Sequence, residues 1–252
     1  MKVLVTLGYE DSAVVHSIGV GSIAEVDLAR GTAQSLVDFR PPPDLCVARK
    51  GFTGATWLAG ANRLDLVVCG FNALYRFSGD PLRHIATLHR PDMNDLHGIC
   101  ALGDRLFVAN TGFDAVDIFR TDGSFAGGFR FEPSWIAGER WAGRTPSRSD
   151  HASALRSGWT QIAANLHDEP QQGSYYEHDR LCNAPFHRRY LRDYVHPNHV
   201  AVVGDQILVT RLADRLIVDA ARHEEVGQAP PVARSEEHTS ELQSQFRISY
   251  AV

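Results

Sequence analysis

The feature that most constrains the fold is a repeat of about 42 residues. Residues 63–77, RLDLVVCGFNALYRF, align with residues 105–119, RLFVANTGFDAVDIF, at a constant offset of 105 − 63 = 42. The Arg, Leu, Gly, Phe, Ala and Phe letters keep their places, and each copy reads as two short strands joined by a glycine turn. A period near 42 built from short strands is typical of the blades of a β-propeller, each of which is a four-stranded sheet. The sequence therefore predicts an all-β fold.

Strand rhythm also returns late in the chain. Residues 196–218, HPNHVAVVGDQILVTRLADRLIV, align with the third blade. His199 aligns with His97, and the Gly-Asp turn at 204–205 aligns with the one at 103–104. The offset is 199 − 97 = 102 before the turn and 204 − 103 = 101 at the turn, which predicts a difference of one residue in hairpin length. We therefore expect four blades, at about residues 1–42, 43–86, 87–130 and 196–233.

Two segments break the repeat. Residues 131–195 lack regular alternation but carry three of the four tryptophans, eight arginines and four histidines. Long segments of this kind are usually functional or disordered, and the aromatic content argues against disorder. The second segment ends the chain: RSEEHTSELQS at 234–244 is the translation of a widely used sequencing-library adapter. We expect residues 234–252 to be an assembly artefact and the natural propeller, truncated here, to continue beyond Ala233.

Bulk properties narrow the classes of partner. The formal net charge of −5 gives no support to a nucleic-acid or anionic-membrane partner, because such partners select basic surfaces. No run approaches the roughly 18 apolar residues of a membrane span, and no signal peptide is recognisable, so we expect a cytoplasmic protein. The four cysteines have no metal-ligand spacing and are expected to act as small apolar residues.

Strand alternation predicts which polar residues gather on one face. If the strand that begins near His97 lines the central channel, then the loop at 92–96, the turn at 110–114, the long segment at 131–195 and the loop at 196–198 all lie at the same end of the blades. A functional insertion beside a polar channel mouth is the expected anatomy of a propeller binding site. The candidate residues on that face are Asn94, Asp95, His97, Asn110, Asp114, Asn198, His199 and Arg211.

These residue types allow two kinds of chemistry. Asparagine and aspartate oxygens suit a hard cation such as calcium, whereas a neutral histidine suits a transition metal or the role of general base. In the second blade, the positions that match Asn94 and His97 hold Phe52 and Ala55, so the blade itself does not require the polar set.

Each candidate also has a structural interpretation. For the two residues beside the glycine turn, it is stabilisation of the backbone. For the two histidines it is packing in the channel against a backbone partner, and for the two asparagines it is capping of a loop. Arg211 stands where Asn110 stands in the third blade, so a surface salt bridge competes with anion binding there.

The motifs NDLHGI, ANTGFDAV and HPNHV, with the 42-residue period, resemble the six-bladed propellers of the NHL and gluconolactonase (regucalcin-like) superfamily, and most of all its bacterial members with an S/N-TGFD turn. The resemblance covers residues 1–129 and 196–218 and implies six blades, of which about four are present. In the lactonase branch a divalent cation, usually calcium, is held by an early glutamate, an asparagine and a later aspartate. The resemblance implies that Asn94 or Asn198 stands for that asparagine, whereas the early E-G-P motif is absent.

Three functional hypotheses follow. The first is binding of a small polar or anionic ligand, such as a sugar derivative, at the channel mouth, either directly or through Ca²⁺ or another divalent cation. The second is a metal-dependent lactonase or esterase with His97 or His199 as general base. The third is a non-catalytic scaffold that binds a protein partner through residues 131–195.

Overall fold

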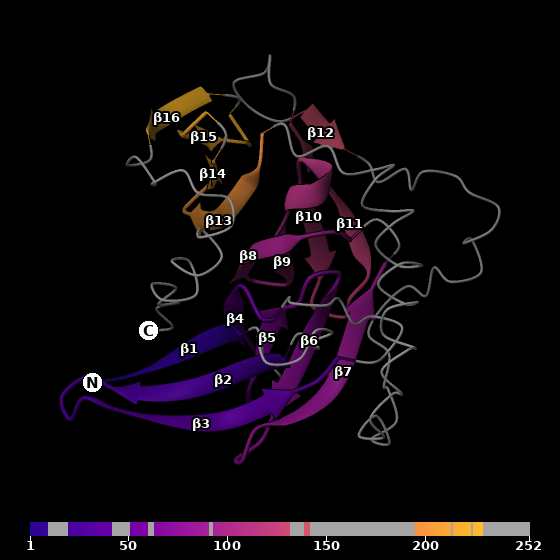
Figure 1. Cartoon of the computed structure of the whole chain (residues 1–252). Coiled ribbons are helices and arrows are strands. Elements are labelled where there is room, and N and C mark those ends of the chain that lie inside the picture. The colour runs from indigo at the N-terminus through magenta and orange to yellow at the C-terminus, as the bar shows by residue number, and fades with distance from the viewer. Residues whose placement is uncertain are drawn as a thin grey trace, which may run out of the picture.

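The chain folds into four antiparallel β-sheets that follow one another in sequence order (Figure 1). This computed structural model describes residues 1–9, 20–41, 51–59, 63–90, 93–131, 139–141, 195–212, 214–222 and 224–228. They form sixteen strands and one 3-10 turn with no α-helix, so no helix among them is long and apolar enough to cross a membrane. The predicted all-β fold, with four blades in a propeller arrangement, is confirmed.

Each sheet is a meander, because strands that pair are neighbours in the sequence. The first sheet has three strands, the second and fourth have four, and the third has five. The first two sheets are β1 Lys2–Tyr9, β2 Val20–Asp27 and β3 Thr32–Phe39, then β4 Ala55–Ala59, β5 Leu64–Cys69, β6 Ala73–Ser78 and β7 Arg83–His89. The other two are β8 Leu96–Leu102, β9 Arg105–Asn110, β10 Ala115–Arg120, β11 Phe125–Arg130 and β12 Glu139–Trp141, then β13 Pro197–Val203, β14 Gln206–Arg211, β15 Leu216–Asp219 and β16 Glu224–Gln228.

Strand β12 comes from the segment at 131–195, for which the sequence predicts an irregular structure. It pairs with β11 and extends the third sheet. The rest of that segment, apart from Phe131 and Val195, lies outside the described residues, as do residues 234–252.

The strand registers confirm the 42-residue period of the first hairpin. Trp57 pairs with Leu66 in the second sheet, and Ile99 pairs with Val108 in the third. The differences, 99 − 57 and 108 − 66, are both 42. The two hairpins are therefore equivalent residue by residue at this point of the ladder.

The predicted change of offset in the fourth blade is wrong. Ile99 pairs with Val108 and Val200 pairs with Val209, so the offset is 200 − 99 = 101 before the turn and 209 − 108 = 101 after it. The physical reason is that both hairpins close through the same Gly-Asp turn, with a glycine at φ 59 in one and φ 63 in the other. His199 consequently matches Gly98, and the residue that matches His97 is Asn198.

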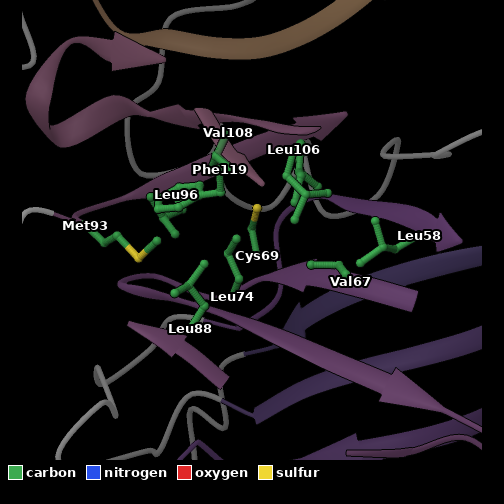
Figure 2. Close-up of a cluster of buried hydrophobic side chains, with 11 residues drawn as sticks. Leu58, Val67, Cys69, Leu74, Leu88, Met93, Leu96, Leu106, Val108 and Phe119 are labelled. Carbon is green, nitrogen blue, oxygen red and sulfur yellow. The ribbon is translucent and has the colours of Figure 1, made fainter. Parts of the chain in front are cut away.

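Apolar cores fill the spaces between consecutive sheets. Figure 2 shows the core between the second and third sheets, to which Val67 and Cys69 of β5 contribute. Leu66 and Val68 of the same strand point to the core shared with the first sheet. Successive side chains of a strand point to opposite faces, so a strand buried on both faces is apolar throughout. Each fully buried valine or leucine contributes about 1.5–3 kcal/mol.

Glycines allow consecutive inner strands to approach closely. A Cβ at Gly54 would lie 2.4 Å from the carbonyl oxygen of His97, and a Cβ at Gly98 would lie 2.8 Å from the Cα of His199. Both contacts are with backbone, which cannot move aside as the end of a side chain can. These two glycines therefore set the spacing of β4, β8 and β13, which carry the candidate site.

Candidate functional site

The loop before β8, the turn after β9 and the start of β13 meet at one end of the sheets. The backbone N–H groups of Gly112 and Thr111 donate to the carbonyl oxygens of Asn94 and Asp95, at 2.9 and 3.2 Å. The Thr111 hydroxyl donates to the carbonyl oxygen of Pro197 at 2.6 Å. The predicted gathering of these segments on one face is therefore confirmed.

Asn110 ties this end of the third sheet together from inside. Its side chain is fully buried; Oδ1 accepts the backbone N–H of Asn94 at 3.1 Å, and Nδ2 donates to Asp117 Oδ2 at 2.8 Å. Asn94 is also buried, and its Nδ2 atom has no hydrogen-bond partner. A Cβ at Gly112 would lie 2.9 Å from the Asn94 amide, so the glycine makes room for it.

Asp114 holds both flanks of the segment at 131–195. It ends the 3-10 turn η2 Thr111–Phe113 in the left-handed conformation, with φ 50, and is fully buried. Its Oδ1 atom accepts the backbone N–H groups of Val195 and His196 at 2.9 and 3.0 Å. Its carbonyl oxygen accepts the N–H of Phe131 at 2.7 Å. Asp114 thus joins the point where the chain leaves the propeller to the point where it returns.

Two imidazoles and a carboxylate come together beside these anchors. His97 Nε2 lies 3.3 Å from Asp95 Oδ1, and the His97 side chain is only 10% exposed. The His196 ring lies 5.4 Å from the His97 ring, centroid to centroid, at an interplanar angle of 62°. This arrangement offers hydrogen-bond donors and acceptors within one small volume.

His196 is a candidate site residue that aligning the blades by sequence identity does not reveal. At the corrected offset it matches Asp95, since 196 − 95 = 101, and the two share a left-handed backbone with φ 54 and φ 52. The ladder register supplies the signal, because it aligns the residues that precede β8 and β13.

The two other candidates on β13 lie one step farther along the strand. Asn198 is half-buried and His199 is exposed. A Cβ at Gly98 would lie 3.0 Å from His199 Nδ1, so the His199 ring lies against the backbone of β8. His199 therefore does not take the position that His97 has in the third sheet.

Arg211 forms an ion pair with Asp214 inside the fourth sheet. The Arg211 side chain is 1% exposed, Nε donates to Asp214 Oδ1 at 3.2 Å, and a second guanidinium nitrogen contacts Oδ2. The backbone N–H of Leu212, the next residue, donates to the carbonyl oxygen of His196 at 2.9 Å. The end of β14 therefore supports the backbone of His196 from the other side.

The divalent cation expected from the sequence stays a prediction. They include no group of three or more His, Cys, Asp or Glu side chains able to hold a metal ion. Of the asparagines expected as ligands, Asn94 is packed against Gly112, and Asn198 is half-buried at the start of β13.

Comparisons with known proteins give structural likenesses only. No family model and no curated protein matches the chain. Among solved structures, the chain is similar to streptogramin B lyase, with 10% identity and a TM-score of 0.41 over 92% of this chain and 60% of that one. It is also similar to virginiamycin B lyase from Staphylococcus aureus, with 10% identity, a TM-score of 0.40 and coverages of 92% and 75%. Glutaminyl cyclase from Myxococcus xanthus gives 12% identity, a TM-score of 0.38 and coverages of 87% and 73%. The chain thus spans 60% of the length of the streptogramin B lyase, and the propeller assignment rests on its own four sheets.

Proposed function

We propose that the face formed by the loop before β8 and the start of β13 binds a small polar or anionic ligand beside the paired rings of His97 and His196. The observation that carries the proposal is the convergence of their imidazoles, 5.4 Å apart, with the Asp95 carboxylate 3.3 Å from His97. Imidazole N–H groups donate to the carboxylate or hydroxyl oxygens of a ligand, and Asp95 accepts from its hydroxyl groups. A sugar acid has both kinds of group.

Two further observations support a sugar-like ligand. The motifs NDLHGI and HPNHV resemble those of the gluconolactonase superfamily, and both lie where the two imidazoles come together. Asn110 and Asp114 are buried and hold the backbone of Asn94 and of His196 beside the cluster. A small group of polar side chains fixed by a rigid buried layer is what a specific binding site requires.

A hydrolase is the second candidate, and the His97–Asp95 pair favours it. A carboxylate at Nε2 orients the imidazole and leaves Nδ1 as the nitrogen that can accept a proton. In a lactone substrate, a water molecule would attack the carbonyl carbon while His97 Nδ1 takes a proton from that water. The ring C–O bond would then break, and the departing alkoxide would receive that proton. The scaffold hypothesis concerns residues 131–195, and it predicts that deleting them abolishes the capture of protein partners while small-molecule binding is kept.

Calorimetric titration of the protein with D-gluconate and with D-glucose tests the leading proposal. His97→Gln and Asp95→Asn are the site variants. Asp205→Asn is the matched control, because Asp205 lies in the β13–β14 turn at the opposite end of the sheet and is 80% exposed. Loss of a charge-assisted hydrogen bond is expected to weaken gluconate binding about tenfold in the site variants and not in the control. Equal affinity in all four proteins, or no binding of either sugar, would overturn the proposal. Release of acid from glucono-lactone, measured in the same variants, tests the hydrolase candidate.

A further inference from the structure

The backbone of His196 has a conformation that it does not favour by itself. Its φ of 54 lies in the left-handed region, where a residue with a Cβ is crowded by its own carbonyl group. Such residues persist when surrounding contacts hold them, and they cluster at functional sites. Two contacts hold the His196 backbone: its N–H donates to the Asp114 carboxylate at 3.0 Å, and its carbonyl oxygen accepts the N–H of Leu212 at 2.9 Å.

The Asp114 carboxylate is well placed to give strong support. It is fully buried, and a single oxygen accepts two consecutive backbone N–H groups, those of Val195 and His196. Hydrogen bonds to an ionised acceptor are shorter and stronger than those between neutral groups. The carboxylate therefore fixes the direction in which the chain enters β13, and with it the position of the His196 side chain.

The repeat shows that the turn itself does not need a carboxylate. The residue that matches Asp114 in the fourth sheet is Arg215, since 215 − 114 = 101, and it has the same left-handed conformation with φ 62. In the second sheet the residue aligned by sequence is Asn72, since 114 − 72 = 42, and it is not among the residues with positive φ. Among these three positions, only Asp114 carries a negative charge, and it is the one that faces the start of β13.

We infer that Asp114 is a positioning residue, which holds His196 against His97 so that imidazoles from two consecutive blades form one binding pair. This inference rests on the proposed function, and it adds a residue that acts through another. The pair takes an anionic ligand that also carries a hydroxyl group, such as a sugar acid, because the His196 N–H can donate to its carboxylate while His97 Nδ1 accepts from its hydroxyl group.

Titration of the histidines by NMR tests the positioning without any ligand. Two imidazoles at this distance influence each other, so His97 and His196 are expected to titrate as a coupled pair. Asp114→Gly removes the carboxylate but tolerates positive φ, and it is expected to abolish the coupling. Asp114→Asn keeps an acceptor oxygen and is expected to restore most of it. Arg215→Gly, at the matching turn position, is the control and should titrate like the wild type.

Binding of D-gluconate then tests the consequence. Asp114→Gly is expected to weaken binding about tenfold or more, and the double variant with His196→Ala should bind no more weakly than His196→Ala alone. Unchanged histidine coupling in Asp114→Gly, or fully additive effects in the double variant, would overturn the inference. If the wild type binds no gluconate while Asp114→Gly still abolishes the coupling, the proposed function fails and the positioning role stands. If the wild type binds gluconate and Asp114→Gly changes neither the histidine coupling nor the binding, the proposed function stands and the positioning role fails.

Discussion

Replacing Gly98 by alanine would test how closely the inner strands approach. The new methyl group would lie 2.8 Å from the Cα of His199 and 3.1 Å from the carbonyl oxygen of Asn198. Carbon atoms in contact normally lie about 3.5–4.0 Å apart. Strands β8 and β13 would therefore have to separate, and the buried layer between the third and fourth sheets would separate with them.

Two opposing effects set the change in the free energy of unfolding. Adding a methyl group to a packed interior costs about 1–3 kcal/mol. Alanine also restricts the unfolded chain more than glycine does, which contributes about 0.4–1 kcal/mol in the other direction. The steric effect is larger, so the free energy of unfolding is expected to fall by about 1–2 kcal/mol, and Tm by about 2–8 °C for a chain of this size.

Thermal melting followed by circular dichroism provides the measurement. Gly227→Ala in β16 is the matched control, because nothing lies within 4 Å of a Cβ there, and it should leave Tm unchanged or raise it slightly. Gly54→Ala should be more harmful than Gly98→Ala, since its Cβ would lie only 2.4 Å from a carbonyl oxygen. Equal Tm values for Gly98→Ala and Gly227→Ala would refute the reasoning.

Three other predictions concern buried or half-buried polar groups. Burial lowers the pKa of His84 below its ordinary value of 6.5, and a backbone hydrogen bond to Ala86 opposes this shift. The neutral form of His84 therefore contributes to the stability of the folded state. This contribution is complete above pH 6.5 and is lost as the pH falls through the folded-state pKa. Urea midpoints at pH 7 and pH 5 should therefore differ less in His84→Phe than in the wild type, and an identical difference would contradict this. Asp65→Ala should lower the free energy of unfolding by about 3–5 kcal/mol in urea melts, because it leaves the Arg76 guanidinium, now 2.6 Å from the carboxylate, without this partner; a loss below about 1 kcal/mol would count against it. Asn94→Leu removes a buried amide nitrogen that has no hydrogen-bond partner and should raise the urea midpoint; a lower midpoint would show that the amide stabilises the fold.

The fold could be predicted because its information is local and repeated. Short strands, glycine turns and the 42-residue offset are all read from adjacent letters, and the antiparallel meander then assigns loops to faces. The continuous apolar run of β5 is explained by burial of both its faces, a consequence of lying between two neighbouring sheets. The same local reading brought Asn94, Asp95 and the turn after β9 to one end of the propeller.

The chemistry of the candidate site depends on contacts that no local pattern contains. The hydrogen bond from Val195 to Asp114 joins residues 81 positions apart across the segment at 131–195. Matching His199 with His97 by identity also conceals the register, because the ladder pairs Ile99 with Val108 and Val200 with Val209, which places Asn198 at the position of His97. Only the ladder shows that His196 occupies the position of Asp95.

What recurs between the third and fourth sheets is backbone geometry, and what changes is the side chain on it. Asp95 and His196 share one left-handed position, and Asp114 and Arg215 share another. A left-handed residue precedes the inner strand in both of these sheets, although one carries aspartate and the other histidine. Because both sheets keep this backbone conformation, the exchange of aspartate for histidine changes the chemistry at this position without changing the fold. The pairing of His196 with His97 results from this exchange. It needs the third and fourth sheets to share the left-handed backbone position and to differ in the side chain on it.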